Sequence, residues 1–371
     1  MQARNPSMRS IHWICNRSMS YKTSTVNVIK SSVTQRSDTR FDHEISTPSS
    51  LDKQNATSLV DMLLELTSNM ISLQGSNVIA FSGGVDSSLV AALVQRSFYA
   101  SLTSINNSSS SIKGKTTAIL GISPAVPDSQ IDLARHIAHD IIKIPLLEIP
   151  TNEGTDETYI ANKGEACLAC KNHLYSTLKS VASHAVSPSA KGSSSSGTIS
   201  DIILFNGTNK DDTNDPTRLG LIAADNFQVR SPLRGISKEE VRIAAKHLGL
   251  PNWNYAASPC LRSRLALGIE ATSKHLKMVE KGEIFVRNVL HLGMEQNLRL
   301  RLLSGGRAGV EVDETLFDTS SIETGDLNGG NVKTTLINAG FESFLEEIGF
   351  KNGEFVVRKF KTGAVSGAPI K

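Results

Sequence analysis

The stretch Ser82-Gly83-Gly84-Val85-Asp86-Ser87-Ser88 decides the fold. It follows a short apolar run at 78–81 and precedes a helical pattern at 86–96. A buried strand, a glycine turn and a helix in this order bring backbone N–H groups and a positive helix end together, which is typical of an anion site. Two adjacent glycines let the backbone turn and approach a phosphate closely. The loop lacks the lysine of a Walker motif, which argues against a GTPase or a Walker-type kinase.

Strand and helix patterns alternate on both sides of this loop. We expect order to begin with an amphipathic helix from Leu59, strands at 117–122, 144–149, 202–205 and 228–233, and helices at 128–141, 171–182 and 237–248. This alternation predicts an α/β fold with a parallel sheet and helices on both faces, spanning residues 58–252.

The rest of the chain, residues 253–371, predicts a smaller α+β domain. A helix is expected at 272–292 and another at 332–348, with strands at 298–303, 310–312 and 354–360. With 371 residues, 39% of them hydrophobic, the chain can bury a core without disulfide staples. No apolar run approaches the roughly 20 residues that cross a bilayer, which excludes a membrane-spanning protein.

The N-terminus differs in composition from the rest. Residues 1–37 hold six basic residues and no acidic one, and they are rich in Ser and Thr. Residues 1–57 are therefore expected to be disordered and to act as a transit peptide for a chloroplast or mitochondrion. The alternative is a disordered basic tail on a cytoplasmic protein. The remainder carries 33 basic and 36 acidic residues, which gives no support for nucleic-acid binding.

Three cysteines lie beyond that segment, at Cys167, Cys170 and Cys260. A helix start beside the first two, and Arg262 and Arg264 beside the third, would favour thiolates. Three soft ligands can hold three corners of a [4Fe–4S] cluster and leave one iron open to bind sulfide. The alternatives are a sacrificial Cys260 that loses its own sulfur, free thiols, and a structural zinc, which would need a fourth ligand.

Two further pairs have the spacing of a binding site. Arg299 and Arg301 alternate along a strand and so face one side, as a clamp for a substrate phosphate would, although a solvated strand has the same pattern. His136 and His139 could share a helix face, but no third ligand accompanies them, so surface or packing roles are favoured.

The glycine loop resembles the PP-loop of the ATP pyrophosphatase superfamily, whose members cleave ATP between its α and β phosphates. Further segments, from about residue 59 to 367, resemble the LarE family of sulfur transferases of nickel-pincer cofactor synthesis. They are CLACK (167–171), NGTNKDD (206–212), RSPLRG (230–235), SKEEVR (237–242), GLPNW (249–253) and SPCLRSR (258–264).

This resemblance implies an adenylating sulfurtransferase. A carboxylate of pyridinium-3,5-biscarboxylic acid mononucleotide would react with MgATP and then become a thiocarboxylate, in an enzyme that forms homo-oligomers. Three-cysteine members resemble the cluster scheme, and single-cysteine members the sacrificial one. The implied ATP ligands are Ser82, Gly83, Gly84, Asp86, Ser87 and Ser88, with Asp86 also orienting Mg²⁺; Asn209, Asp212, Arg264, Arg299 and Arg301 complete the cofactor-binding set.

The family position also implies an acid–base role for Glu283, with Glu280 as its alternative and Glu311 as a weaker candidate. The chain departs from the family pattern twice. Asn206 stands where an aspartate is usual, and 308–311 lacks an expected arginine. Two other functions remain open. A tRNA thiolase would need a basic stripe, and a non-catalytic nucleotide or metal sensor would have little need of both the loop and the cysteines.

Overall fold

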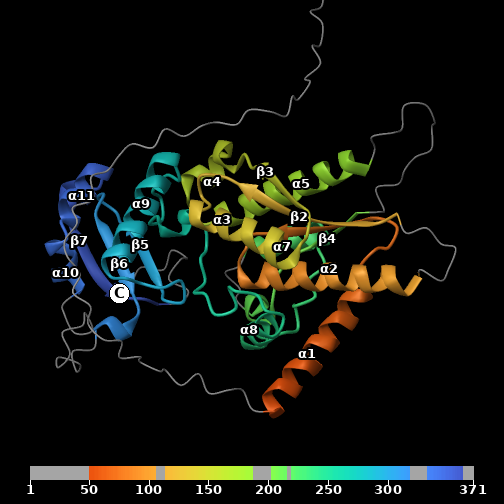
Figure 1. Cartoon of the computed structure of the whole chain (residues 1–371). Coiled ribbons are helices and arrows are strands. Elements are labelled where there is room, and N and C mark those ends of the chain that lie inside the picture. Colours follow the sequence, from red (N-terminus) through yellow and green to blue (C-terminus); the bar gives the residue numbers. More distant parts are fainter. Residues whose placement is uncertain (1–49, 106–112, 187–201, 215–218, 318–331, 362–371) are drawn as a thin grey trace, which may run out of the picture. The chain divides into compact units, whose positions relative to one another are not determined.

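The apolar run before the glycine loop lies inside a parallel sheet. The computed structural model describes residues 50–105, 113–186, 202–214, 219–317 and 332–361, and every structural statement below refers to these. The strands are β1 (Ser76–Phe81), β2 (Lys115–Ile122), β3 (Leu146–Pro150) and β4 (Ile202–Phe205). Their order is β3-β2-β1-β4 and each neighbouring pair is parallel (Figure 1). The predicted α/β fold is confirmed.

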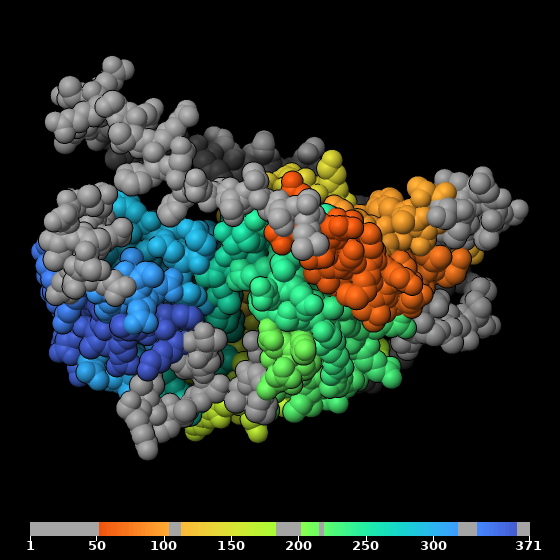
Figure 2. Space-filling view, turned by 90° about the horizontal axis from the view of Figure 1, so that it is seen from below, coloured from red at the N-terminus to blue at the C-terminus, as the bar shows by residue number. Residues whose placement is uncertain are grey.

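Alternate residues of β1 face opposite sides of the sheet, as the pleat requires. Ile79 and Phe81 pack in one apolar cluster and Val78 in another. The first cluster includes helices α1 (Ser50–Ser68), α2 (Val85–Ile105), α3 (Asp128–His136) and α8 (Lys238–His247), and the second includes α5 (Ala166–Val186) and α7 (Gly220–Asn226). Figure 2 shows the orange-red atoms of α1 beside the green atoms of α8, against which α1 packs.

A smaller mixed sheet follows in the sequence. Its strands are β5 (Leu298–Leu302), β6 (Ala308–Val312) and β7 (Phe355–Lys359), in that order. β5 and β6 are antiparallel, and β6 and β7 are parallel. Helices α9 (Ser273–Val289), α10 (Val332–Asn338) and α11 (Phe341–Ile348) share one apolar cluster with this sheet. The structure also describes two short α-helices, α4 (Glu157–Ala161) and α6 (Lys210–Thr213).

Several element boundaries differ from the prediction; α5, for example, begins at Ala166 and not at residue 171. α1 begins at Ser50, so residues 50–57 are helical and not disordered; Asp52 lies in its first turn, where the helix dipole favours a carboxylate. The strand expected at 228–233 is only a single bridge at Arg230, because the nearby Pro232 has no N–H for a ladder. The helix expected at 332–348 breaks at Gly340, whose φ is +78°.

The structure does not test two of the predictions. The proposed transit peptide lies mainly in residues 1–49, outside the described residues, and stays a prediction, as does the division into domains at residue 252. Among the described helices none is long and apolar enough to cross a membrane.

Candidate active site

The glycine loop turns tightly between β1 and α2. Gly83 has a φ of +71°, and a Cβ there would lie 2.8 Å from the Cα and Cβ atoms of Ala134 in α3. Gln130 of α3 donates from Nε2 to the carbonyl oxygen of Ser82 at 2.8 Å. Helix α3 is therefore one wall of the loop, and both the backbone and this wall require glycine at position 83.

The hydroxyl of Ser87 closes the loop from inside. It accepts a hydrogen bond from the Ser82 backbone N–H at 3.2 Å and donates to the Gly84 carbonyl at 3.0 Å. Ser87 is buried. This side chain, which the resemblance implies as an ATP ligand, holds the shape of the loop in the structure.

Asn252 is a loop residue whose role the sequence did not reveal. Its Nδ2 donates to the carbonyl of Gly83 at 2.7 Å and to Ser88 Oγ at 3.2 Å, and both Asn252 and Ser88 are fully buried. It lies within the GLPNW segment, which resembles the family but assigned no role to this residue. An asparagine that follows a helix-ending Gly-Leu-Pro segment was the one available signal.

Both carboxylate oxygens of Asp86 have partners. Asn209 Nδ2 donates to Oδ1 at 3.0 Å, and Lys238 Nζ lies 2.5 Å from Oδ2. A Cβ on Gly207 would lie 2.8 Å from the Asp86 Cβ, so the turn after β4 reaches Asp86 only because it carries a glycine. The structure therefore brings the predicted Asn209 to the glycine loop.

Lys238 places a positive charge beside the glycine loop, which has no lysine of its own. It is the first residue of α8, after Ser237, which forms a capping box with Glu240. Its backbone N–H also donates to Asp211 Oδ2 at 2.8 Å. The sequence indicated only the helix cap, because nothing local shows that a lysine at 238 reaches residue 86.

Two of the polar residues after β4 serve the local backbone. Asn209 and Asp212 form the capping box of α6, with Asp212 N donating to Asn209 Oδ1 at 3.0 Å. Asn206, where the family has aspartate, donates from Nδ2 to Tyr175 Oη at 3.0 Å and accepts from Ser231 Oγ at 2.5 Å. The amide can make both bonds, which explains how the asparagine is accommodated.

The three cysteines are contributed by two segments. Cys167 and Cys170 lie in the first turns of α5, and Cys260 precedes a 3-10 turn at Leu261–Arg264. Cys170 and Cys260 pack against one apolar cluster, and Arg262 Nη2 donates to Cys167 Sγ at 2.7 Å. The structure thus places the predicted cysteines around Arg262. Among the described side chains, however, no group of three His, Cys, Asp or Glu is placed to hold a metal ion.

Burial decides the protonation of Cys170. It raises the pKa of this thiol to about 12, with smaller contributions from Cys260 and Glu153, and Lys171 only partly opposes it. The expectation that the helix N-terminus makes Cys170 a thiolate is therefore wrong, because desolvation of the charged form outweighs the helix dipole.

We expect iodoacetamide to alkylate Cys170 about tenfold or more slowly than the exposed Cys167 at pH 8, since only the thiolate reacts. Peptide mass spectrometry of the full chain over time gives both rates. Raising the pH toward 12 should accelerate Cys170, and in urea the two rates should converge. Equal rates in the folded protein at pH 8 would show that Cys170 is not desolvated.

Glu283 and Arg264 hold the loop that carries Cys260. Arg264 is 1% exposed; its Nε lies 2.9 Å from Glu283 Oε1, and its Nη1 donates to the carbonyls of Pro259 and Cys260. Glu283 Oε1 also accepts from the Leu300 N–H at 3.0 Å. In this arrangement the predicted acid–base residue orients Arg264, and Arg264 orients the backbone of Cys260.

The two arginines of β5 differ in their partners. Arg301 Nε lies 2.6 Å from Glu311 Oε1 in a buried ion pair. Arg299 donates to the carbonyls of Leu298 and Ala257, and burial, with a further contribution from Arg264, lowers its pKa to about 10. Glu311 therefore balances the charge of Arg301, whereas the hydrogen bonds of Arg299 go to neutral carbonyl oxygens.

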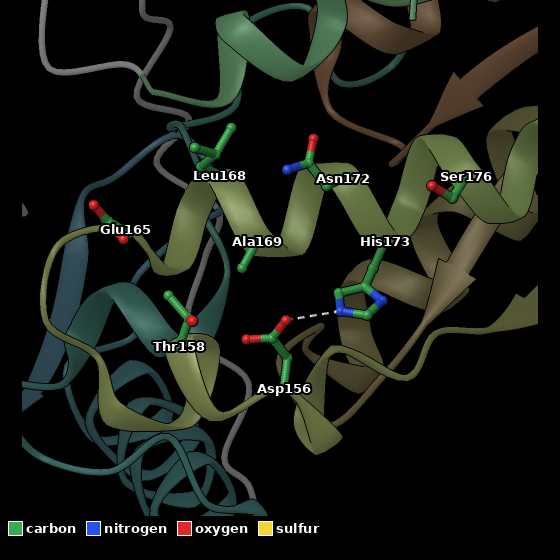
Figure 3. A pocket seen from close by; sticks show the side chains of 8 residues that line it. All are labelled: Asp156, Thr158, Glu165, Leu168, Ala169, Asn172, His173 and Ser176. Carbon is green, nitrogen blue, oxygen red and sulfur yellow. Dashed lines mark hydrogen bonds and ion pairs between the residues drawn. The ribbon is translucent and has the colours of Figure 1, made fainter. Parts of the chain in front are cut away.

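An open pocket of about 360 Å³ lies along α5. Figure 3 shows Ala169, Asn172 and His173 on this helix, with His173 directed toward Asp156, whose Oδ2 lies 3.0 Å from His173 Nε2. None of the predicted site residues lines it.

His136, in α3, pairs with Asp140 on the surface, as the surface role predicts.

Comparisons with known proteins found similar sequences. An uncharacterized protein of Synechocystis sp. is 33% identical over 234 residues, which are 60% of this chain and 74% of that protein. The pyridinium-3,5-bisthiocarboxylic acid mononucleotide synthase of Lactiplantibacillus plantarum is 28% identical over 220 residues, 57% of this chain and 67% of that enzyme. No protein-family model matches the chain.

Proposed function

Because this chain belongs to the LarE family of sulfurtransferases, we propose that it adenylates a carboxylate with ATP and then exchanges an oxygen of that carboxylate for sulfur. The proposed substrate is pyridinium-3,5-biscarboxylic acid mononucleotide, since the Lactiplantibacillus relative is named for the bisthiocarboxylic product. The observation that carries the proposal is the glycine loop at the start of α2, with Asp86 and Lys238 at its edge. Homo-oligomer formation and an organellar location stay predictions.

Adenylation uses the loop. A substrate carboxylate oxygen attacks the α-phosphorus, the bond from that phosphorus to the bridging oxygen breaks, and pyrophosphate leaves with the electron pair. Backbone N–H groups at the start of α2 would meet the phosphates, as helix N-termini commonly do. Asp86 is the carboxylate that would hold Mg²⁺, which prefers oxygen ligands, and the ion would compete with Lys238 for it.

Sulfur transfer follows at the cysteines. A sulfur nucleophile attacks the acyl carbon and AMP leaves, giving the thiocarboxylate. If Cys260 is itself the donor, its attack first gives a thioester; a base then removes the Cα proton of Cys260, the Cβ–Sγ bond breaks, and the thiocarboxylate leaves while dehydroalanine remains. Arg264 and Glu283 would position this cysteine through its backbone carbonyl.

The donor set of Cys167, Cys170 and Cys260 is chemically suited to a [4Fe–4S] cluster, which would supply sulfide on the iron that has no protein ligand. Arg262 beside Cys167 would balance part of the negative charge of such ligands. Within the part of the chain that the structure describes, these side chains do not form a closed metal site.

The substrate phosphate is assigned to Arg299. Its guanidinium is buried, its pKa is lowered by burial and by the neighbouring Arg264, and its hydrogen bonds go to neutral carbonyls. An anion beside it would relieve this unfavourable environment. Arg301 already has the charge of Glu311 and is assigned a supporting role.

Lys238→Ala is expected to raise the KM for ATP in pyrophosphate release about tenfold, because the loop loses the side-chain cation that pairs with Asp86. Lys238→Arg should retain most activity. Lys246→Ala is the matched control on the same helix, since Lys246 lies over the ring of Trp253. A Lys238→Ala enzyme with unchanged kinetics would exclude Lys238 from nucleotide binding.

The proposed function is tested by the products of ATP cleavage. We expect AMP and pyrophosphate in equal amounts, formed only when the biscarboxylic mononucleotide is present. ADP and phosphate, or ATP cleavage that ignores this substrate, would contradict adenylation.

A further inference from the structure

Helix α9 carries two carboxylates, one turn apart, that contact different elements. Glu283 binds Arg264 and the N–H of Leu300, as described above. Glu280 is 5% exposed, and its Oε1 accepts the backbone N–H of Asp128 at 2.6 Å. Asp128 is the first residue of α3. One helix therefore contacts both the Cys260 loop and the start of α3.

Glu280 replaces a cap that α3 lacks. The N-cap residue, Pro127, offers no side-chain hydrogen bond. The first backbone N–H groups of a helix have no intrahelical acceptor, and a carboxylate there also interacts favourably with the helix dipole. Lys277 Nζ lies 2.7 Å from Glu280 Oε2 and 3.2 Å from Asp128 Oδ2, which completes a network of three charged groups.

The capped helix is the wall of the glycine loop. Gln130, in the first turn of α3, donates to the Ser82 carbonyl, and Ala134 fills the space where Gly83 would carry a Cβ. A displacement of the α3 N-terminus would therefore move atoms that contact Ser82 and Gly83.

The position of α9 is itself closely fixed. A Cβ on Gly282, between the two glutamates, would lie 1.9 Å from Leu300 Cδ2. Helix α9 therefore packs closely against the Leu300 side chain of β5 at this position.

We propose that Glu280 is a positioning residue that holds the glycine loop in its nucleotide-binding shape through α3, and that α9 thereby links this loop to the Cys260 loop. The proposal rests on the proposed function only in taking the glycine loop as the ATP site. A link of this kind is reciprocal, so nucleotide binding should change the environment of Cys260.

The test compares Glu280→Ala with the wild-type full chain, using the non-hydrolysable analogue α,β-methylene-ATP with Mg²⁺ in isothermal titration calorimetry. We expect the Kd to rise about five- to tenfold, within the usual range of coupling between sites. Glu280→Gln, which still accepts the Asp128 N–H, should recover part of the loss. Lys281→Ala, which changes an exposed lysine on the same helix outside this network, should bind within about twofold of wild type.

A second readout separates positioning from a merely structural role. Saturating analogue should change the rate of Cys260 alkylation by iodoacetamide severalfold in the wild type and clearly less in Glu280→Ala. Unchanged Kd in Glu280→Ala, or an equal effect of the analogue on Cys260 in both proteins, would overturn the proposal.

If Glu280→Ala does not fold, Gln130→Ala tests the same path at the loop, because this half-buried side chain is not part of the core. Its Kd should also rise, and normal binding would overturn the proposal. Analogue binding requires neither turnover nor sulfur transfer. A wild type that binds the analogue but makes no thiocarboxylate therefore contradicts the proposed function alone.

Discussion

Asp86→Asn is expected to abolish ATP-dependent pyrophosphate release while the protein stays folded. The substitution keeps the size of the side chain and removes the charge that pairs with Lys238 and would hold Mg²⁺. Loss of one preorganised charge at a reacting phosphate typically costs at least about 10²-fold in rate. Pyrophosphate release by a coupled assay, with circular dichroism to verify folding, measures the effect.

Ser87→Ala should also abolish pyrophosphate release, because it alters the shape of the glycine loop. Its buried hydroxyl joins the Ser82 N–H to the Gly84 carbonyl, so alanine leaves the loop without this closure at a folding cost of about 1 kcal/mol. Asp132→Asn, which changes an exposed carboxylate on α3, is the matched control for Asp86→Asn and should be fully active. Normal pyrophosphate release by Asp86→Asn would refute the assignment of the glycine loop to ATP.

Cys260→Ala is expected to stop sulfur transfer completely and to leave pyrophosphate release intact, because adenylation precedes the attack of sulfur. Cys15→Ala, outside the described residues, is the control and should retain both steps. Thiocarboxylate and pyrophosphate are measured in the same reaction. A Cys260→Ala enzyme that still transfers sulfur would exclude this cysteine from the sulfur path.

The other cysteines decide the source of sulfur. With a cluster, Cys167→Ala and Cys170→Ala should each also lose iron and sulfur transfer, and sulfide should support more than one turnover. With sacrifice, only Cys260 is essential, product stops at one per chain, and the chain becomes lighter by one H₂S, about 34 Da. Multiple turnovers at unchanged mass would contradict sacrifice, and a single turnover with that loss would contradict the cluster.

The sequence predicted the parts of the site that depend on local pattern. A strand, two glycines and a helix start predict an anion-binding loop from local pattern alone, and Gly83 has the positive φ that such a turn requires. The family resemblance also implied that Asn209 belongs to the cofactor-binding set, and in the structure Asn209 contacts Asp86. The parallel sheet followed from the continuous apolar runs, since strands covered on both faces have no polar side.

The contacts that the sequence did not predict join distant segments. Lys238 and Asn252 reach the loop from more than 150 residues away, and their own surroundings indicated only a helix cap and a helix end. Burial of Cys170 likewise depends on the fold around it, while the helix start that favours a thiolate is visible locally. Glu280 and Glu283 look alike in the sequence, and only the fold gives them different partners.

The most direct test of the account is mass spectrometry of the acceptor. The full chain is incubated anaerobically with MgATP, pyridinium-3,5-biscarboxylic acid mononucleotide, iron and sulfide. We expect a product heavier by the difference between sulfur and oxygen for each converted carboxylate, formed only with ATP and not by Cys260→Ala. Cleavage of ATP to AMP and pyrophosphate with an acceptor of unchanged mass would contradict sulfur transfer to this substrate.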